Sequence, residues 1–217
     1  VSTTTAQQSL HTSIRPVHHG SLGHYRWSGF TGILPAALGA NSEIFQFRWS
    51  HATNLAVILN IRISACVTTT FFAAGVPVTI DLLKSSAWSV AGTGGTAPTL
   101  AATCKNRNGF ASSSMTAGDL RIATTAALGA GTKTLEANSM AALVAPGPIT
   151  ASLNGQIIAP GTVLWEPNPA DGQHPLVLGG AGGGANSEGF SIRSVAVPAT
   201  GTWQAAIMVD WAEVVAY

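Results

Sequence analysis

A long run of alternating positions over residues 55–67 limits the folds that this chain can adopt. Its odd positions are almost all large and apolar: Leu55, Val57, Leu59, Ile61, Ile63, Ala65 and Val67. Asn60, Arg62 and Ser64 lie between them. Successive side chains of a β-strand point to opposite faces, whereas a helix repeats about every 3.6 residues. The run therefore predicts a β-strand whose odd-numbered face lies in the core, and helical periodicity does not fit it.

Similar alternation elsewhere indicates about eight strands in all. The strand period is clear at residues 43–49, 76–82, 190–193 and 203–211, and shorter at 120–123, 132–135 and 163–165. The aromatic residues of 45–49 and 203–211 are expected to line the core. We expect residues 85–118 to be loop and 139–144 to form a turn of helix. Strands with long Gly-rich connections are typical of an all-β fold, here an antiparallel β-sandwich, and eight strands favour a jelly roll.

Residues 1–38 are predicted to form an extended N-terminal arm, and residues 39–217 a single β-sandwich domain with long Gly-rich loops. The segment begins with polar residues and later carries aromatic residues without a steady period. Chain termini are mobile unless something ties them down, so the arm should attach either to its own domain or to a neighbouring molecule. The interface residues predicted in it are Arg15, His18, His19, His24, Tyr25 and Trp27.

Charge is scarce in this chain. Charged residues make up 9% of the sequence, against roughly a quarter in an ordinary domain, and the net charge is +1. No run of basic residues is present, which argues against nucleic-acid binding. No apolar stretch approaches the ~18 residues of a membrane span, and the polar first ten residues do not resemble a signal peptide. A surface so poor in charge keeps copies apart badly, so it suits a protein that works inside an assembly.

No catalytic or metal site is predicted. His18, His19 and His24 are close in sequence, but adjacent residues of an extended segment point to opposite sides, and no carboxylate in the segment completes a ligand set. The glycine run at 179–184 lacks the Lys of a phosphate-binding loop, and no Gly-x-Ser-x-Gly elbow occurs. Asp81 and Asp210 are expected to be solvated or salt-bridged. We therefore predict no enzyme, no cofactor and no metal ion.

The two cysteines are too few for a disulfide-stapled scaffold. Cys66 lies in the apolar run 55–67 and is expected to be a small core residue. The sequence leaves a disulfide between Cys66 and Cys104 open.

Aromatic residues near predicted loops offer a different function. Trp88, Trp165, Tyr25 and Trp27 lie in such regions. Exposed rings of this kind, beside Asn and Asp, would suit a carbohydrate-binding jelly roll, which is the alternative from a different functional class.

Several segments taken together resemble a type of structural protein of tailed bacteriophages. They are Ala-Asn-Ser-Glu-Ile-Phe-Gln-Phe-Arg-Trp at 40–49, Ala-Thr-Thr-Ala-Ala-Leu-Gly-Ala-Gly-Thr-Lys-Thr-Leu at 123–135, Glu-Gly-Phe at 188–190 followed by Arg193, and Val-Pro-Ala-Thr-Gly-Thr-Trp at 197–203 leading to Trp-Ala-Glu at 211–213. The resemblance extends from about residue 38 to the C-terminus. These segments are packing and turn patterns rather than catalytic motifs.

The resemblance implies a capsid cement, or decoration, protein. Such a protein would be made in the host cytoplasm and would lie on the capsid exterior of the virion. Its expected partners are the major capsid protein and copies of itself in a homotrimer, with no nucleic acid and no membrane. A tail or fibre component of the same virion is the nearest alternative, because composition does not separate the two.

Overall fold

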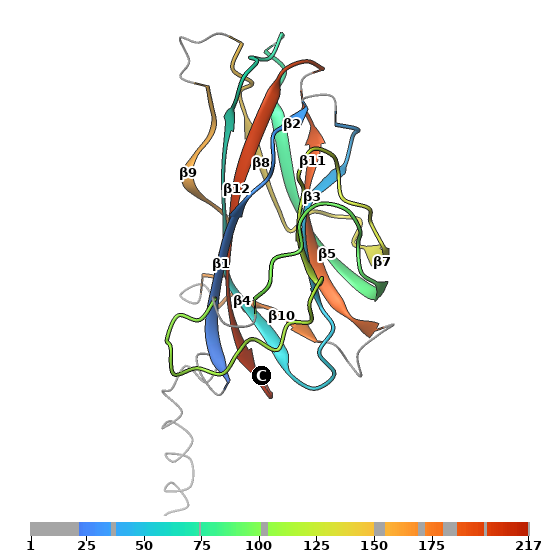
Figure 1. Cartoon of the computed structure of the whole chain (residues 1–217), viewed down its shortest axis with the longest axis vertical. Helices are drawn as coiled ribbons and strands as arrows, with labels where there is room; N and C mark the ends of the chain where they lie inside the picture. Colours follow the sequence, from blue (N-terminus) through green and yellow to red (C-terminus); the bar gives the residue numbers. More distant parts are fainter. Residues whose placement is uncertain are drawn as a thin grey trace, which may run out of the picture.

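The structure, a computed structural model, describes residues 22–35, 38–73, 75–100, 104–149, 155–168, 172–179, 186–197 and 199–216. Within these ranges the chain forms twelve β-strands and no α-helix. The strands make two six-stranded sheets that pack against each other (Figure 1). Sheet A contains β1 (Gly23–Phe30), β2 (Leu34–Pro35), β4 (Leu55–Val67), β9 (Gln156–Trp165), β10 (Leu176–Gly179) and β12 (Thr202–Val214). Sheet B contains β3 (Ser42–Trp49), β5 (Val78–Val90), β6 (Leu120–Ile122), β7 (Thr132–Leu135), β8 (Ala141–Ala145) and β11 (Glu188–Ala196).

The strand pairs are nested along the chain. β1 pairs with β12, β3 with β11, β4 with β10 and β5 with β8, and every pair is antiparallel. The strands β1, β3, β4 and β5 therefore alternate between the two sheets. The expected all-β antiparallel sandwich is confirmed. The jelly roll stays a prediction, which the nesting favours because a long antiparallel hairpin rolled into two sheets produces this order.

Aromatic side chains fill the space between the sheets. Phe47 stacks on Phe190 with ring centroids 5.1 Å apart, and Trp27 stacks on Phe45 at 5.5 Å. The core role expected for residues 45–49 and 203–211 is confirmed, since these side chains are fully buried: Phe45, Phe47, Trp49, Trp203, Ala205, Val209 and Trp211. Stacked and edge-to-face aromatic pairs each add about 0.5–1.5 kcal/mol beyond the area that they bury.

One β-bulge divides the long strand β4. Asp210 of β12 lies opposite Asn60, but the next residue, Trp211, lies opposite Ile58, so Leu59 is the extra residue. Because an extra residue reverses the side-chain alternation, the odd positions point into the core only after the bulge. Before it, Val57 lies instead with Ala212 in a small separate hydrophobic cluster. The expectation of one continuous apolar face over residues 55–67 is therefore wrong at its N-terminal end.

The part of the long β5–β8 connection around Lys133 is held against sheet B by a buried charged group. The Glu43 carboxylate accepts hydrogen bonds from the Lys133 ammonium at 2.6 Å, from Gln46 Nε2 at 2.6 Å and from the Ser191 hydroxyl at 2.8 Å. We call these four residues the Glu43 cluster. The Lys133 side chain is only 2% exposed, and its ammonium lies 4.0 Å from the centre of the Trp88 ring. Burial lowers the pKa of Lys133, against the opposing influence of Glu43.

Two local expectations are wrong because tertiary pairing decides the structure. β5 extends to Val90, so the predicted loop over 85–118 begins later than expected. The predicted turn of helix over 139–144 is instead the strand β8, because Ala141–Ala145 pairs with the start of β5. A short apolar segment of this kind takes whichever backbone form its neighbours allow.

Cys66 is exposed rather than a core residue, which corrects the expectation from the sequence. It lies opposite Gln204 on the outward side of sheet A, while Ala65 and Val67 on either side of it are buried. Cys104 is buried, and no disulfide joins it to Cys66.

Candidate functional site

The described part of the predicted arm belongs to the sandwich. β1 pairs with β12 along its whole length, and β2 pairs with the start of β12. The expected boundary at residue 38 is therefore wrong for residues 22–35, which the sheet holds in place. Arg15, His18 and His19 lie outside the described residues.

Three of the predicted interface residues lie in β1. Tyr25 is fully buried and Trp27 is 8% exposed, so neither presents its ring to a partner, and their assignment to an interface is corrected. Both rings point between the sheets, where Tyr25 stacks on Trp211. His24 is half-buried on the other side of the strand, and burial lowers its pKa.

The carboxylates that drew attention in the sequence are salt-bridged. Asp81 accepts two hydrogen bonds from the Arg193 guanidinium, at 3.0 and 2.6 Å. Asp210 accepts two from Arg26, at 2.6 and 2.9 Å. These bidentate pairs raise the pKa of both arginines, with the hydrogen bond as the main cause. In the part of the chain that the structure describes, no group of three or more His, Cys, Asp or Glu side chains could hold a metal ion.

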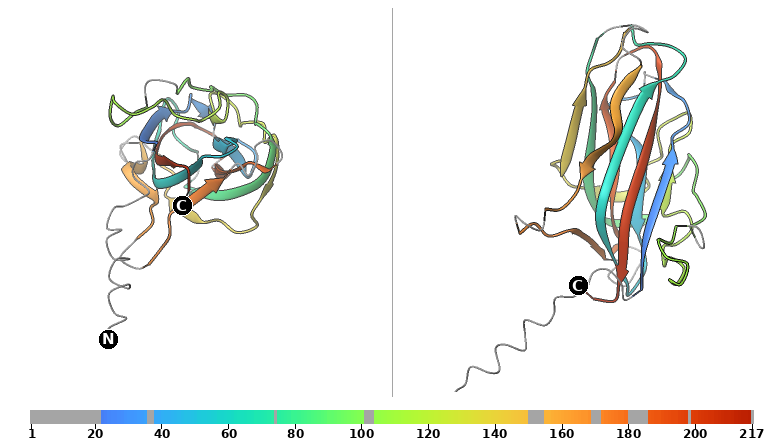
Figure 2. Two further views of the ribbon diagram at one scale, coloured as in Figure 1. Left: turned by 90° about the horizontal axis from the view of Figure 1, so that it is seen from below. Right: turned by 90° about the vertical axis from the view of Figure 1, so that its left-hand side faces the viewer.

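The outward face of sheet A is a more open surface. β9, β4, β12 and β1 lie side by side across it (Figure 2, right). Strand register places two short side chains next to Phe30 in the middle of the face: Ala206 lies opposite Phe30, and Ser64 lies opposite Ala206. In the next row Ser28 lies opposite Met208. Short side chains beside longer ones leave a depression in the sheet surface.

We call this depression the trough. It consists of two adjoining hollows, of about 330 and 180 Å³, which share Phe30, Ser64 and Ala206 in their lining. Pro160 and Gly161 of β9 line the opposite side. Phe30 is 71% exposed. Isolated exposed apolar side chains are ordinary on protein surfaces, but an exposed aromatic ring beside an apolar depression is a feature of contact sites.

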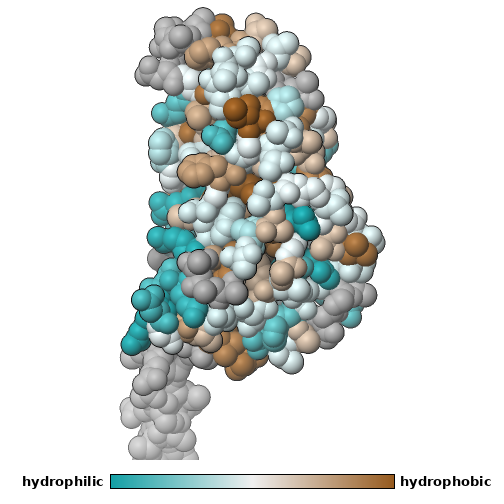
Figure 3. All heavy atoms as spheres, in the orientation of Figure 1, coloured by the Kyte–Doolittle hydropathy of each residue, from teal (hydrophilic) through white to brown (hydrophobic). Residues whose placement is uncertain are grey.

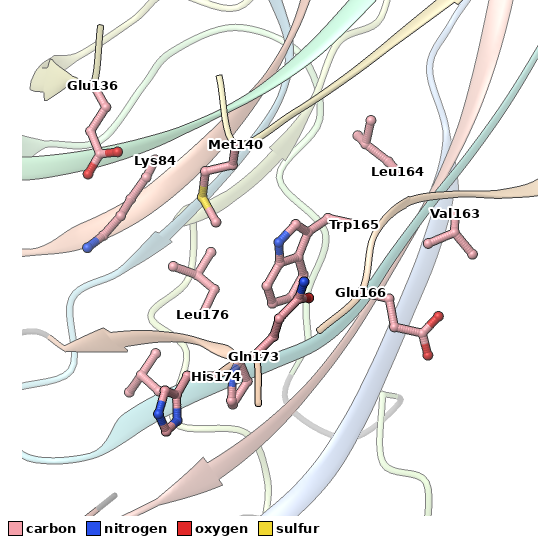
Figure 4. Close-up of a pocket in the computed structure, with 12 residues that line it drawn as sticks. Lys84, Glu136, Met140, Val163, Leu164, Trp165, Glu166, Gln173, His174 and Leu176 are labelled. Carbon is pink, nitrogen blue, oxygen red and sulfur yellow. The ribbon is translucent and has the colours of Figure 1, made fainter. Parts of the chain in front are cut away.

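A second concave site lies where β9 and β10 approach the β5–β8 side of the molecule. We call it the open hollow, and its volume is about 880 Å³. Figure 4 shows the indole of Trp165 in the middle of its lining, with Lys84 and Glu136 toward one side and Glu166 toward the other. The complete lining is Lys84, Glu136, Met140, Val163, Leu164, Trp165, Glu166, Gln173, His174, Pro175, Leu176 and Val177.

Trp165, one of the four aromatic candidates from the sequence, lines the open hollow. It is half-buried, at the last residue of β9, and Pro167 follows two residues later where the chain leaves the sheet. Trp88, Tyr25 and Trp27 are all buried. Sequence reasoning did not select Phe30, the trough or Gln173, because no local pattern distinguishes them from other surface residues.

Comparison with known proteins adds no relative. No family model matches the chain, and no match is found among curated proteins or solved structures. Among the described residues, no helix is long and apolar enough to cross a membrane. On the face shown in Figure 3, hydrophobic residues lie in small separate patches among weakly polar ones.

Proposed function

We propose that this chain is a structural protein of a tailed-phage virion that binds the outer capsid shell as a homotrimer and stabilises it. The observation that carries the proposal is the exposed ring of Phe30 beside the trough on sheet A. The low charge of the sequence and its resemblance to phage structural proteins support the same function.

A threefold ring brings one surface of each copy against a different surface of the next. Phe30 lines one side of the trough, and Pro160 and Gly161 of β9 line the other. The Phe30 ring of one copy can therefore pack against the β9 side of its neighbour's trough three times around the axis. Burying a Phe side chain contributes about 1.5–3 kcal/mol. A trimer closed by three such contacts is held together more firmly than a dimer joined by one, because each contact raises the effective concentration of the surfaces that form the others.

Such a trimer would suit a pressurised shell. A capsid filled with DNA must resist outward force at the junctions between its subunits. A trimer bound across a junction touches several subunits at once, so weak individual contacts add up to firm attachment. The scarcity of surface charge lowers the repulsion between the trimer and the shell.

Co-sedimentation with empty, undecorated capsids of the phage that encodes the chain tests this function. The wild-type protein is expected to travel with the capsids through a density gradient. The Phe30→Asp variant is expected to bind at least about tenfold more weakly, because a buried, unpaired carboxylate opposes the contact. Absence of the wild-type protein from the capsid fraction contradicts the proposal, and its appearance with isolated tails instead supports a tail or fibre component.

A further inference from the structure

We propose that the open hollow binds a neutral oligosaccharide, with the indole of Trp165 as its stacking surface. This inference does not depend on the proposed function, because the lining of the open hollow shares no residue with the trough. It assigns a second, separate surface to the chain.

Trp165 offers what a sugar ring needs from an aromatic partner. Sugar C–H groups form an apolar face that packs on a flat ring, while an indole N–H donates to a polar group at the edge. Trp165 is held in register by its pairing with Ile61 of β4, so its backbone is part of the sheet and not of a free loop. Among the described residues its indole N–H has no hydrogen-bond acceptor, which leaves it available to a ligand hydroxyl.

The surrounding side chains supply both donors and acceptors. Lys84 can donate, Glu136 can accept, and the Gln173 amide can do both. Gln173 is partly fixed by two hydrogen bonds to Asn168. Its side-chain Oε1 accepts from the backbone N–H of Asn168 at 3.0 Å, and its backbone N–H donates to the backbone carbonyl of Asn168 at 3.1 Å. The side-chain nitrogen of Gln173, Nε2, therefore remains free to donate. Sugar hydroxyls both donate and accept, so this mixed rim matches them.

The charge balance favours a neutral ligand. The hollow has one ammonium group, Lys84, and two carboxylates, Glu136 and Glu166. Lys84 also lies 3.8 Å from the carboxylate of Glu188, which offsets its charge further. A polyanion would meet net repulsion here. An apolar lining that includes Leu176, with a few polar groups around it, is the usual composition of a small-molecule site.

The test is a titration of the full chain with three neutral oligosaccharides: maltohexaose, cellohexaose and chitohexaose. Saturation-transfer NMR detects binding, and calorimetry gives the Kd. At least one hexasaccharide is expected to bind in the millimolar range, because the hollow is wide and open. Trp165→Ala should weaken that binding at least about tenfold, and Gln173→Ala about threefold.

Matched variants keep the result interpretable. Trp165 packs against the core, so near-ultraviolet circular dichroism must first show that Trp165→Ala is folded. Gln173 is exposed, so Gln173→Ala tests the hollow without that risk. Phe30→Ala, on the trough, should bind the sugar like the wild type. Failure of all three hexasaccharides to bind at about 10 mM overturns the proposal. Binding that is unchanged in both hollow variants overturns it as well.

Discussion

Replacing Lys133 with Met should destabilise the fold strongly. Lys133 is the cation that neutralises Glu43, whose side chain is 6% exposed. Met keeps an unbranched side chain, one heavy atom shorter than that of Lys, without the charge. The change leaves a buried carboxylate with only Gln46 and Ser191 as hydrogen-bond donors from the Glu43 cluster. Removing one partner of a buried ion pair costs about 3–5 kcal/mol. In a domain of this size that loss lowers the Tm by roughly 6–20 °C.

Urea unfolding followed by tryptophan fluorescence measures this loss. Lys84→Met is the matched control, because the Lys84–Glu188 pair is partly exposed and 3.8 Å apart, so its removal should cost less than about 1 kcal/mol. The double variant Glu43→Gln/Lys133→Met removes both charges and should recover much of the stability. A loss below about 1 kcal/mol for Lys133→Met, or a double variant less stable than the single one, would show that the buried Lys133–Glu43 ion pair does not hold the fold together.

Raising the pH should destabilise the fold through Tyr25, because desolvation, with a smaller contribution from Glu213, raises the pKa of its phenol to about 12. The folded chain keeps this proton where an unfolded tyrosine, with a pKa of about 10, releases it, so the free energy of unfolding falls as the pH rises from about 10 toward 12. Ultraviolet absorbance of phenolate in the Tyr217→Phe variant checks this, and ionisation of Tyr25 near pH 10 would contradict it. Gly189→Ala should cost more than about 3 kcal/mol, because its new Cβ would overlap the Phe47 carbonyl oxygen. Gly161→Ala, at a φ of +72° with no atom within 4 Å, should cost about 1–2 kcal/mol, and the reverse order in urea unfolding would refute both estimates. Removing the first 27 residues, and with them much of β1, should prevent stable folding, and a native circular dichroism spectrum after this deletion would contradict the account.

Alternation of side chains was enough to predict the fold class and much of the core. It works along β12 because the phase of that strand does not change between Trp203 and Trp211, and all the odd-numbered side chains between them are buried. It fails in β4 because the extra residue at Leu59 is set by pairing with β12, and no local pattern marks it. The same kind of long-range pairing turned residues 141–145 into a strand.

The candidate sites were harder to predict from the sequence than the fold was. The trough exists because Phe30 and Ala206, at opposite ends of the chain, lie opposite each other in neighbouring strands. Its depth comes from short side chains that look ordinary in sequence. Trp165 was among the aromatic candidates. What distinguishes it from the other three, Trp88, Tyr25 and Trp27, is that they are buried, and the packing of the two sheets decides which rings are buried.

Light scattering measures the solution mass of the purified chain and so shows directly whether it forms a trimer. We expect a stable trimer of about three times the 22.1 kDa chain mass. Phe30→Asp should shift the mass toward the monomer, whereas Val144→Asp should leave it unchanged. Val144 is equally exposed, at 71%, but lies in β8 of sheet B, away from the trough. A wild-type protein that stays monomeric, or a Phe30→Asp variant that stays trimeric, would contradict the account.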